Sequence, residues 1–227
     1  MIVMDIEVLV QDVRDQLDQP DSSYLTHTIL MRWLNQGQKV VARKTKCVHK
    51  ITDLTTVAGQ NAYEIPDCLG IKQVFYWQTS DSGYRLRHMS MRGLSDFGFV
   101  NTISGNPRVW VDQPIGTTRN IEVYPAPMTS GLTIRVYYYA LPTTMICAVD
   151  GGGFPVDDPS NVDPELPEEY QDILVTWCRY KLRLMEEDPA QAAQYLDDFN
   201  RELKEIRSAE FFKHNADAPG IAVDYFF

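Results

Sequence analysis

The sequence contains no long hydrophobic run, and this argues against a helical membrane protein. No stretch of the 227 residues approaches the ~18 consecutive apolar residues that a bilayer-spanning helix requires. The segment Met1–Glu7 also lacks the basic region and apolar core of a secretory signal. We therefore expect a protein that is made in the cytoplasm and has no membrane partner.

Catalytic and cofactor motifs are also absent. The sequence has no Gly-rich phosphate loop ending in Lys-Ser or Lys-Thr, no paired-histidine helix, no nucleophile elbow and no kinase signature. None of the four histidines, at positions 27, 49, 88 and 214, has a nucleophile beside it. We therefore expect no catalytic residue and no cofactor, and the protein is not predicted to be an enzyme.

Cysteine is sparse and scattered. Cys47, Cys68, Cys147 and Cys178 show neither the close pairs of a zinc site nor the density of a secreted disulfide scaffold. We expect them to be reduced and mostly buried. Cys47 and His49 could supply two metal ligands, but a second pair is missing, so no metal site is predicted.

Basic residues are outnumbered by acidic ones, and the net charge is -10. Because nucleic-acid affinity depends mainly on Lys and Arg, this composition argues against a surface built to grip phosphates. The charge is unevenly spread: residues 32–50 contain six bases and no acid, whereas residues 151–172 contain seven acids and no base. These segments could meet within one subunit or between neighbouring subunits.

Helical spacing of apolar residues marks both ends of the chain. It predicts helices over residues 5–17 and 26–44, and Gly37 in the second one suggests close approach of another backbone. Pro167 and the acidic residues after it favour the start of a third helix at this point. A break at 187–189 precedes a last helix that runs to about His214.

Between these ends the apolar period changes to two. About seven short strands are predicted between residues 49 and 139, with hairpin tips at 58–61 and 80–83. A short helix capped by Ser90 interrupts them. A small antiparallel β-sandwich or a curled sheet is the natural way to close such strands.

The expected fold class is therefore α+β. A helical layer from the N- and C-terminal helices carries an inserted β part and an extended C-terminal tail. The predicted domains are a discontinuous helical domain (1–48 and 165–214), an inserted β domain (49–145), an acidic Gly/Pro loop (146–164) and the tail (215–227).

Two groups of side chains suggest ligand sites as alternatives. The acidic loop could supply oxygen ligands to calcium or magnesium from Asp157, Asp158, Asn161, Asp163 and Glu165. The loop lacks the glycine and the ligand spacing of an EF-hand, however, and a solvated loop is the simpler interpretation. A carbohydrate-binding or hydrolytic module could use Trp77, Trp110, Asp112 and Tyr137, although aromatics that alternate along a strand more often fill a core or a subunit contact.

Five ordered motifs carry a resemblance to a known family. They are Trp33-Leu-Asn35, Gly59-Gln60 with Tyr63 and Pro66, Tyr124-Pro125-Ala-Pro127, Tyr137 to Pro142, and Leu166-Pro167-Glu-Glu-Tyr170. In this order they resemble the head-to-tail adaptor, or connector, proteins of tailed bacteriophages.

The resemblance implies a structural protein of the virion neck that is made in the host cytoplasm. Such proteins form twelve-membered rings between the portal protein and a tail or nozzle protein, and they continue the DNA channel. We expect DNA to pass without specific binding, because an acidic ring repels phosphates. A minor tail-completion protein of similar fold is an alternative that differs in its neighbour.

Two contacts of such a ring can be assigned to residues. The apolar tail is predicted to dock on the portal or on a neighbouring adaptor through Ile221, Val223, Tyr225, Phe226 and Phe227, the alternative being a frayed terminus. The lateral ring contact is predicted to join Arg43 and Lys44 of one subunit to Glu168 and Glu169 of the next, the alternative being a pairing inside one subunit.

Overall fold

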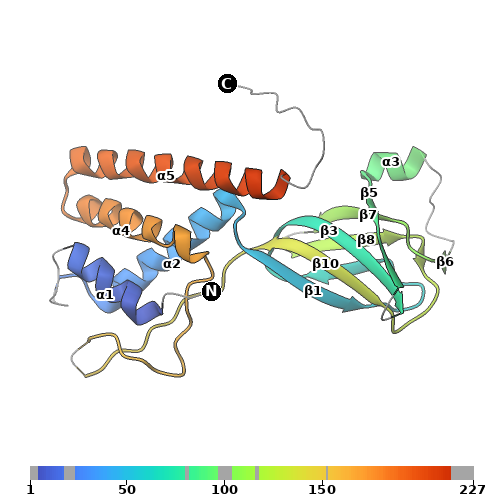
Figure 1. Ribbon diagram of the computed structural model, residues 1–227, viewed down its shortest axis with the longest axis horizontal. Coiled ribbons are helices and arrows are strands. Elements are labelled where there is room, and N and C mark those ends of the chain that lie inside the picture. The colour runs from blue at the N-terminus through green and yellow to red at the C-terminus, as the bar shows by residue number, and fades with distance from the viewer. Residues whose placement is uncertain are drawn as a thin grey trace. The chain divides into compact units, whose positions relative to one another are not determined.

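The computed structural model describes residues 5–17, 24–79, 82–96, 104–115, 118–151 and 153–215. The chain divides into two compact units. The helical unit comprises Met1–Cys47 and Pro142–Phe227, and the β unit comprises Val48–Leu141 (Figure 1). The N-terminal and C-terminal helices therefore belong to one unit, and the strands lie between them in sequence.

The helical unit contains α1 (Ile6–Gln16), α2 (His27–Thr45), α4 (Asp172–Met185) and α5 (Pro189–Asn215), with the 3-10 turn η1 (Glu168–Tyr170) just before α4. Helices α4 and α5 lie side by side, α2 packs against both, and α1 packs against α4 (Figure 1). The two N-terminal helices begin and end within about a residue of the predicted positions.

Local sequence signals set the helix ends. The Thr26 hydroxyl accepts the N–H of Ile29 at the start of α2, and Lys46 ends that helix in the left-handed conformation. Asp188 accepts the N–H of Gln191 just before α5, whose first residue is Pro189. The break predicted at 187–189 is therefore a capped helix start.

The core of the helical unit is built around a contact between Gly37 of α2 and Trp177 of α4. A Cβ atom on Gly37 would lie 2.7 Å from Cδ1 of Trp177 and 3.1 Å from Cδ2 of Leu174. The neighbour of Gly37 is therefore an indole side chain and not the backbone that was predicted. The same indole lies 5.0 Å from the ring of Phe199 on α5, centroid to centroid, so it contacts both partner helices.

The β unit has ten strands in its described residues, most of them in two four-stranded sheets. The first sheet has the order β1 (His49–Thr55), β10 (Thr133–Ala140), β3 (Cys68–Thr79), β4 (Ser82–Arg85), and all its pairs are antiparallel. The second has the order β2 (Ala62–Ile65), β8 (Thr118–Tyr124), β7 (Val109–Ile115), β5 (Arg87–His88). A further pair joins β6 (Ser104–Gly105) to β9 (Ala126–Pro127).

Alternation along the strands places the core of the β unit. On β10, Ile134, Val136 and Tyr138 are buried, and the residues between them are half-buried on the other face. On the second sheet, Ile121 and Val123 of β8 are fully buried, and β8 packs against β3 of the first sheet. The arrangement is a small sandwich, as predicted, except that the short pairs β5–β7 and β6–β9 are parallel.

The predicted short helix is present as α3 (Met91–Asp96). The Ser90 hydroxyl accepts the N–H of Gly93 at its start, which confirms the predicted cap. Leu94 joins a small apolar cluster with Val109, Val111 and Tyr124.

The combination of helices and largely antiparallel sheets confirms the α+β fold class. Within the described residues, no helix is both long and apolar enough to cross a bilayer.

Replacing Gly37 with Ala is expected to lower the free energy of unfolding. Alanine gains about 1 kcal/mol of helix propensity, but the new Cβ would lie 2.7 Å from the Trp177 ring, and overpacking of a core costs about 1–3 kcal/mol. We expect a net loss of about 1 kcal/mol in urea unfolding followed by tryptophan fluorescence. Gln36→Ala at the adjacent exposed position is the control and should stay within about 0.5 kcal/mol of wild type. A Gly37→Ala variant as stable as wild type would contradict this account of the core.

Candidate assembly surfaces

The residues predicted to make the lateral ring contact lie on two surfaces of the helical unit. Arg43 and Lys44 are in the last turn of α2, and both are exposed. Glu168 and Glu169 form the start of η1, and both are exposed as well. All four side chains are therefore accessible to a neighbouring molecule.

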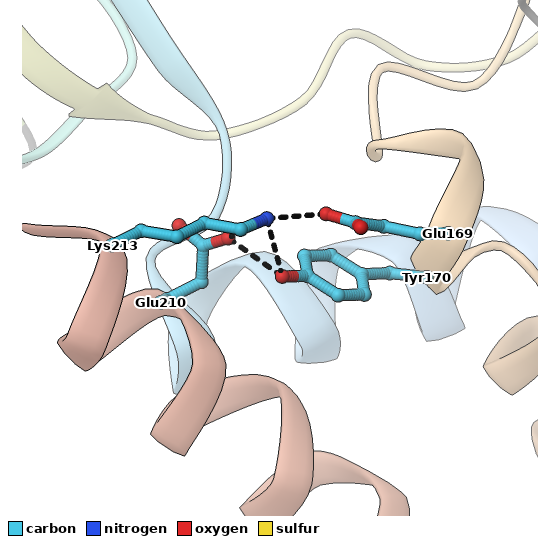
Figure 2. A network of polar contacts seen from close by, with 4 residues as sticks. All are labelled: Glu169, Tyr170, Glu210 and Lys213. Carbon is cyan, nitrogen blue, oxygen red and sulfur yellow. Dashed lines mark hydrogen bonds and ion pairs between the residues drawn. The ribbon is translucent and has the colours of Figure 1, made fainter.

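Glu169 also takes part in a polar network inside the helical unit. The Lys213 ammonium donates hydrogen bonds to the Glu169 carboxylate and to the Tyr170 hydroxyl, the latter at 3.0 Å; dashed lines mark both in Figure 2. The Tyr170 hydroxyl in turn donates to Oε1 of Glu210 at 2.8 Å. Glu210 is buried, so this hydrogen bond satisfies a carboxylate that is hidden from water. The network fastens η1 to the last turns of α5.

Burial and neighbouring charge set the protonation of this network. Burial raises the pKa of the Tyr170 hydroxyl to about 12, with Glu210 acting in the same direction and Lys213 opposing it. The hydrogen bond from Lys213 lowers the pKa of the Glu169 carboxyl, and the same bond raises the pKa of Lys213. At neutral pH the tyrosine therefore keeps the proton that it donates to Glu210, and the ion pair is fully charged.

An open groove with an acidic lining lies beside α5, between that helix and the α4 side of the unit. This acidic groove has a volume of about 640 Å³. Four carboxylates and one guanidinium line it: Glu169, Asp172, Glu202, Glu205 and Arg179. Burial raises the pKa of the Glu202 carboxyl, and a hydrogen bond from the Thr176 hydroxyl opposes this shift.

A second groove with a basic lining lies between α5 and the last turn of α2. This basic groove has a volume of about 630 Å³. Four cations and one carboxylate line it: Lys44, Arg201, Lys204, Arg207 and Asp197. Arg201 forms an ion pair with Asp198 at 2.8 Å, yet 68% of its side chain is exposed. The unit therefore carries two surfaces of similar size and opposite charge.

Sequence reasoning identified only the margins of these grooves. Lys44 lines the basic groove and Glu169 lines the acidic one, whereas Arg43 and Glu168 line neither. The charged side chains of α5 were missed, although helical spacing of Arg201, Lys204 and Arg207 was a usable signal.

The four residues considered for a carbohydrate site do not converge. Trp77 and Tyr137 belong to the first sheet, whereas Trp110 and Asp112 belong to the second. Arg135 covers one face of the Trp77 ring at 5.6 Å from its centroid, and Trp110 is buried with its ring 4.4 Å from that of His88. These aromatic faces are occupied by other side chains and do not form a shared stacking platform.

The polar side chains of the acidic loop mostly form hydrogen bonds with other groups of the same chain. Asp163 accepts the N–H of Ile6 at 3.0 Å, and Glu165 accepts the hydroxyl of Thr143 at 2.7 Å. Asn161 accepts the N–H of Ala148 at 2.7 Å and donates to the carbonyl of Val156 at 2.9 Å. Asp158 accepts the Ser160 hydroxyl at 2.6 Å. These hydrogen bonds hold the loop in place, and the side chains that make them contact different partners.

The cysteines are free thiols, and three of the four are buried. Burial raises the pKa of the Cys47 and Cys147 thiols to about 11 each, so both are protonated at neutral pH. In the part of the chain that the structure describes, no three His, Cys, Asp or Glu side chains are grouped as a metal site requires.

The apolar side chains proposed for docking lie outside the described residues. They are Ile221, Val223, Tyr225, Phe226 and Phe227. Their assignment remains a prediction from the sequence.

Comparison with protein families matches nearly the whole chain to one of them. Residues 4–221 match the family model of the SU10 adaptor protein. This match confirms the resemblance to phage head-to-tail adaptors. No curated protein matches the chain.

Replacing Tyr170 with Phe is expected to destabilise the helical unit. The variant removes the hydroxyl that donates to the buried Glu210 carboxylate at 2.8 Å, while the Lys213 ammonium remains at 3.4 Å; the loss of one such donor costs about 1–3 kcal/mol. Adding Glu210→Gln should restore part of the loss, because the buried charge is then removed. Tyr24→Phe, at an exposed tyrosine of the same unit, is the control. Thermal unfolding of the four proteins measures this, and equal midpoints for wild type and Tyr170→Phe would argue against the role given to the network.

Proposed function

The chain belongs to the SU10 adaptor protein family, and from that membership we propose that it forms a ring between the portal and the tail of a phage and continues the DNA channel. The match over residues 4–221 is the observation that supports this function, because it spans both units of the chain. A phage adaptor is a structural component of the virion, so the proposed role needs no catalysis. The proposed ring has twelve copies, as the resemblance to head-to-tail adaptors implies.

The charge of the chain is compatible with a channel for DNA. Each copy has a net charge of -10, so a closed ring is strongly acidic. An acidic lumen repels phosphates, and DNA can then move through it without being held. Low affinity for DNA is therefore the useful property in this role.

We propose that lateral contacts in the ring involve the basic end of α2 and the acidic start of η1 in the next copy. Arg43, Lys44, Glu168 and Glu169 are all exposed, which supports this contact. Lys44 and Glu169 also line grooves of opposite charge. Glu169 already forms an ion pair with Lys213 of the same chain. Glu168 forms no ion pair with any residue that the structure describes, so it is the acid that is free to meet a neighbouring copy.

The ring can be tested directly by microscopy. Negative-stain images of the purified protein, alone and mixed with the portal protein of the same phage, should contain rings of uniform size. Binding to DNA at physiological salt should be weak and nonspecific in a mobility-shift assay. Binding to a tail protein but not to the portal would instead support the tail-completion role. A chain that remains a single copy under all these conditions, or tight DNA binding by the isolated protein, would argue against the proposal.

We further propose that the apolar tail docks on the portal or on a neighbouring adaptor. Burying its five large apolar side chains gains about 8–15 kcal/mol, whereas ordering the nine residues from Pro219 costs about 9–18 kcal/mol. A single tail therefore comes close to balance. Several tails on one ring bind with a high effective concentration, which favours docking.

Removing residues 219–227 should therefore reduce assembly onto the portal. The measurement is co-sedimentation of the adaptor with purified portal protein, and we expect a loss of roughly tenfold or more in affinity. Ala222→Ser changes a small residue in the same segment and serves as a control that should bind normally. If the shortened chain binds portal as well as wild type does, the tail has no docking role.

A further inference from the structure

Helix α5 carries opposite charges on its two flanks, and we propose that these flanks join neighbouring copies of the chain. In this arrangement the basic side of α5 in one copy rests against the acidic groove of the next copy. The inference rests on the proposed ring and names the surface that would hold the ring together. Its partner is a second copy of this chain.

The helical repeat separates the two kinds of charge. Phe199, Leu203 and Ile206 form the buried stripe of α5. At about 100° per residue, Lys204 and Arg207 fall on one side of this stripe, and Glu202 and Glu205 fall on the other. One helix thus supplies part of both grooves, and each groove faces a different way.

The charges in the two grooves are numerically complementary. The basic groove has four cations and one carboxylate, and the acidic groove has four carboxylates and one guanidinium, so their formal charges are +3 and -3. Arg201 and Glu169 also pair with Asp198 and Lys213 of the same chain, and the remaining lining charges still have opposite signs, so a second copy offers each groove a partner of opposite charge.

Several of these charges form no ion pair within the part of the chain that the structure describes. Among the described residues, no ion pair involves Lys44, Lys204 or Arg207 in the basic groove. The same holds, within the described part of the chain, for Asp172 and Glu205 in the acidic groove. The long side chains of Lys204 and Arg207 are exposed and can reach into a concave partner surface.

The placement of the grooves determines the kind of assembly. A two-fold dimer that set either groove against the same groove of its partner would bring like charges together. Joining different patches head to tail repeats the same contact from copy to copy, and it forms a ring when the rotation closes. Charge complementarity of this kind fixes orientation and suppresses the wrong contact more than it adds affinity.

The interface can be tested with two charge-reversed variants. Lys204→Glu with Arg207→Glu makes both grooves acidic, and Asp172→Lys with Glu205→Lys makes both grooves basic. Each variant alone should lose ring formation, with a rise of roughly tenfold or more in the concentration needed for assembly. Arg32→Glu with Lys39→Glu changes the charge by the same amount on α2, outside both grooves, and should assemble like wild type. Circular dichroism verifies that every variant is folded.

Mixing the two variants gives the decisive measurement. In an equal mixture each acidic surface can meet a basic one, so the variants should co-assemble into rings in which they alternate. Native mass spectrometry distinguishes such rings, because the variants differ in mass. The same alternation should appear when the mixture is added to the portal protein of the same phage.

The outcomes separate this interface from the proposed function. Rings from wild type and from each variant alone would overturn the interface and leave the ring in place. Wild type that remains a single copy, alone and with portal, would overturn both. If the Lys204→Glu, Arg207→Glu variant still forms rings but loses retention on a DNA column, the basic groove is a nucleic-acid surface and the interface proposal is wrong.

Discussion

The helical unit depends on the absence of a side chain at Gly37. Because Gly37 has no Cβ, the Trp177 indole can lie directly against α2 while it also contacts Phe199 of α5. This contact fixes the spacing of α2, α4 and α5 together. Residues of α4 and α5 line the acidic groove, and residues of α5 and α2 line the basic one, so the helices that this contact joins also carry the two grooves. A core constraint thus determines the surface that the protein presents to other molecules.

A second constraint acts at the C-terminal end of α5. The buried carboxylate of Glu210 requires donors, and Tyr170 of η1 supplies one at 2.8 Å, with Lys213 at 3.4 Å from the same oxygen. Lys213 then pairs with Glu169, so that an exposed acid and an exposed base hold η1 in place. Exposed ion pairs contribute little energy by themselves. The main effect of this pair is to orient η1, which forms one edge of the acidic groove.

Periodic patterns allowed prediction of the elements but not of their partners. The apolar stripe of α2 and the alternation on β10 are strong local signals, and both elements were predicted correctly. The two-residue strands of the parallel pairs carry no such pattern, and their pairing could not be read from the sequence. The partner of Gly37 depends on a tryptophan far along the chain, and Lys213 lies 44 residues from Glu169. The charge runs at 32–50 and 151–172 are visible in the linear sequence, whereas the acids and bases of α5 alternate in sequence and separate only on the folded helix.

The net charge of the chain and the charge of its grooves act over different distances. Two copies at -10 each repel one another as they approach. Salt screens that repulsion beyond a Debye length of about 8 Å at physiological ionic strength. Opposite charges that meet within the grooves are closer than this, so they are screened less. Long-range repulsion therefore disfavours unspecific association, and attraction becomes effective only when the basic side of one α5 faces the acidic groove of another copy. The same acidic chain can in this way stay dispersed and still assemble in one orientation.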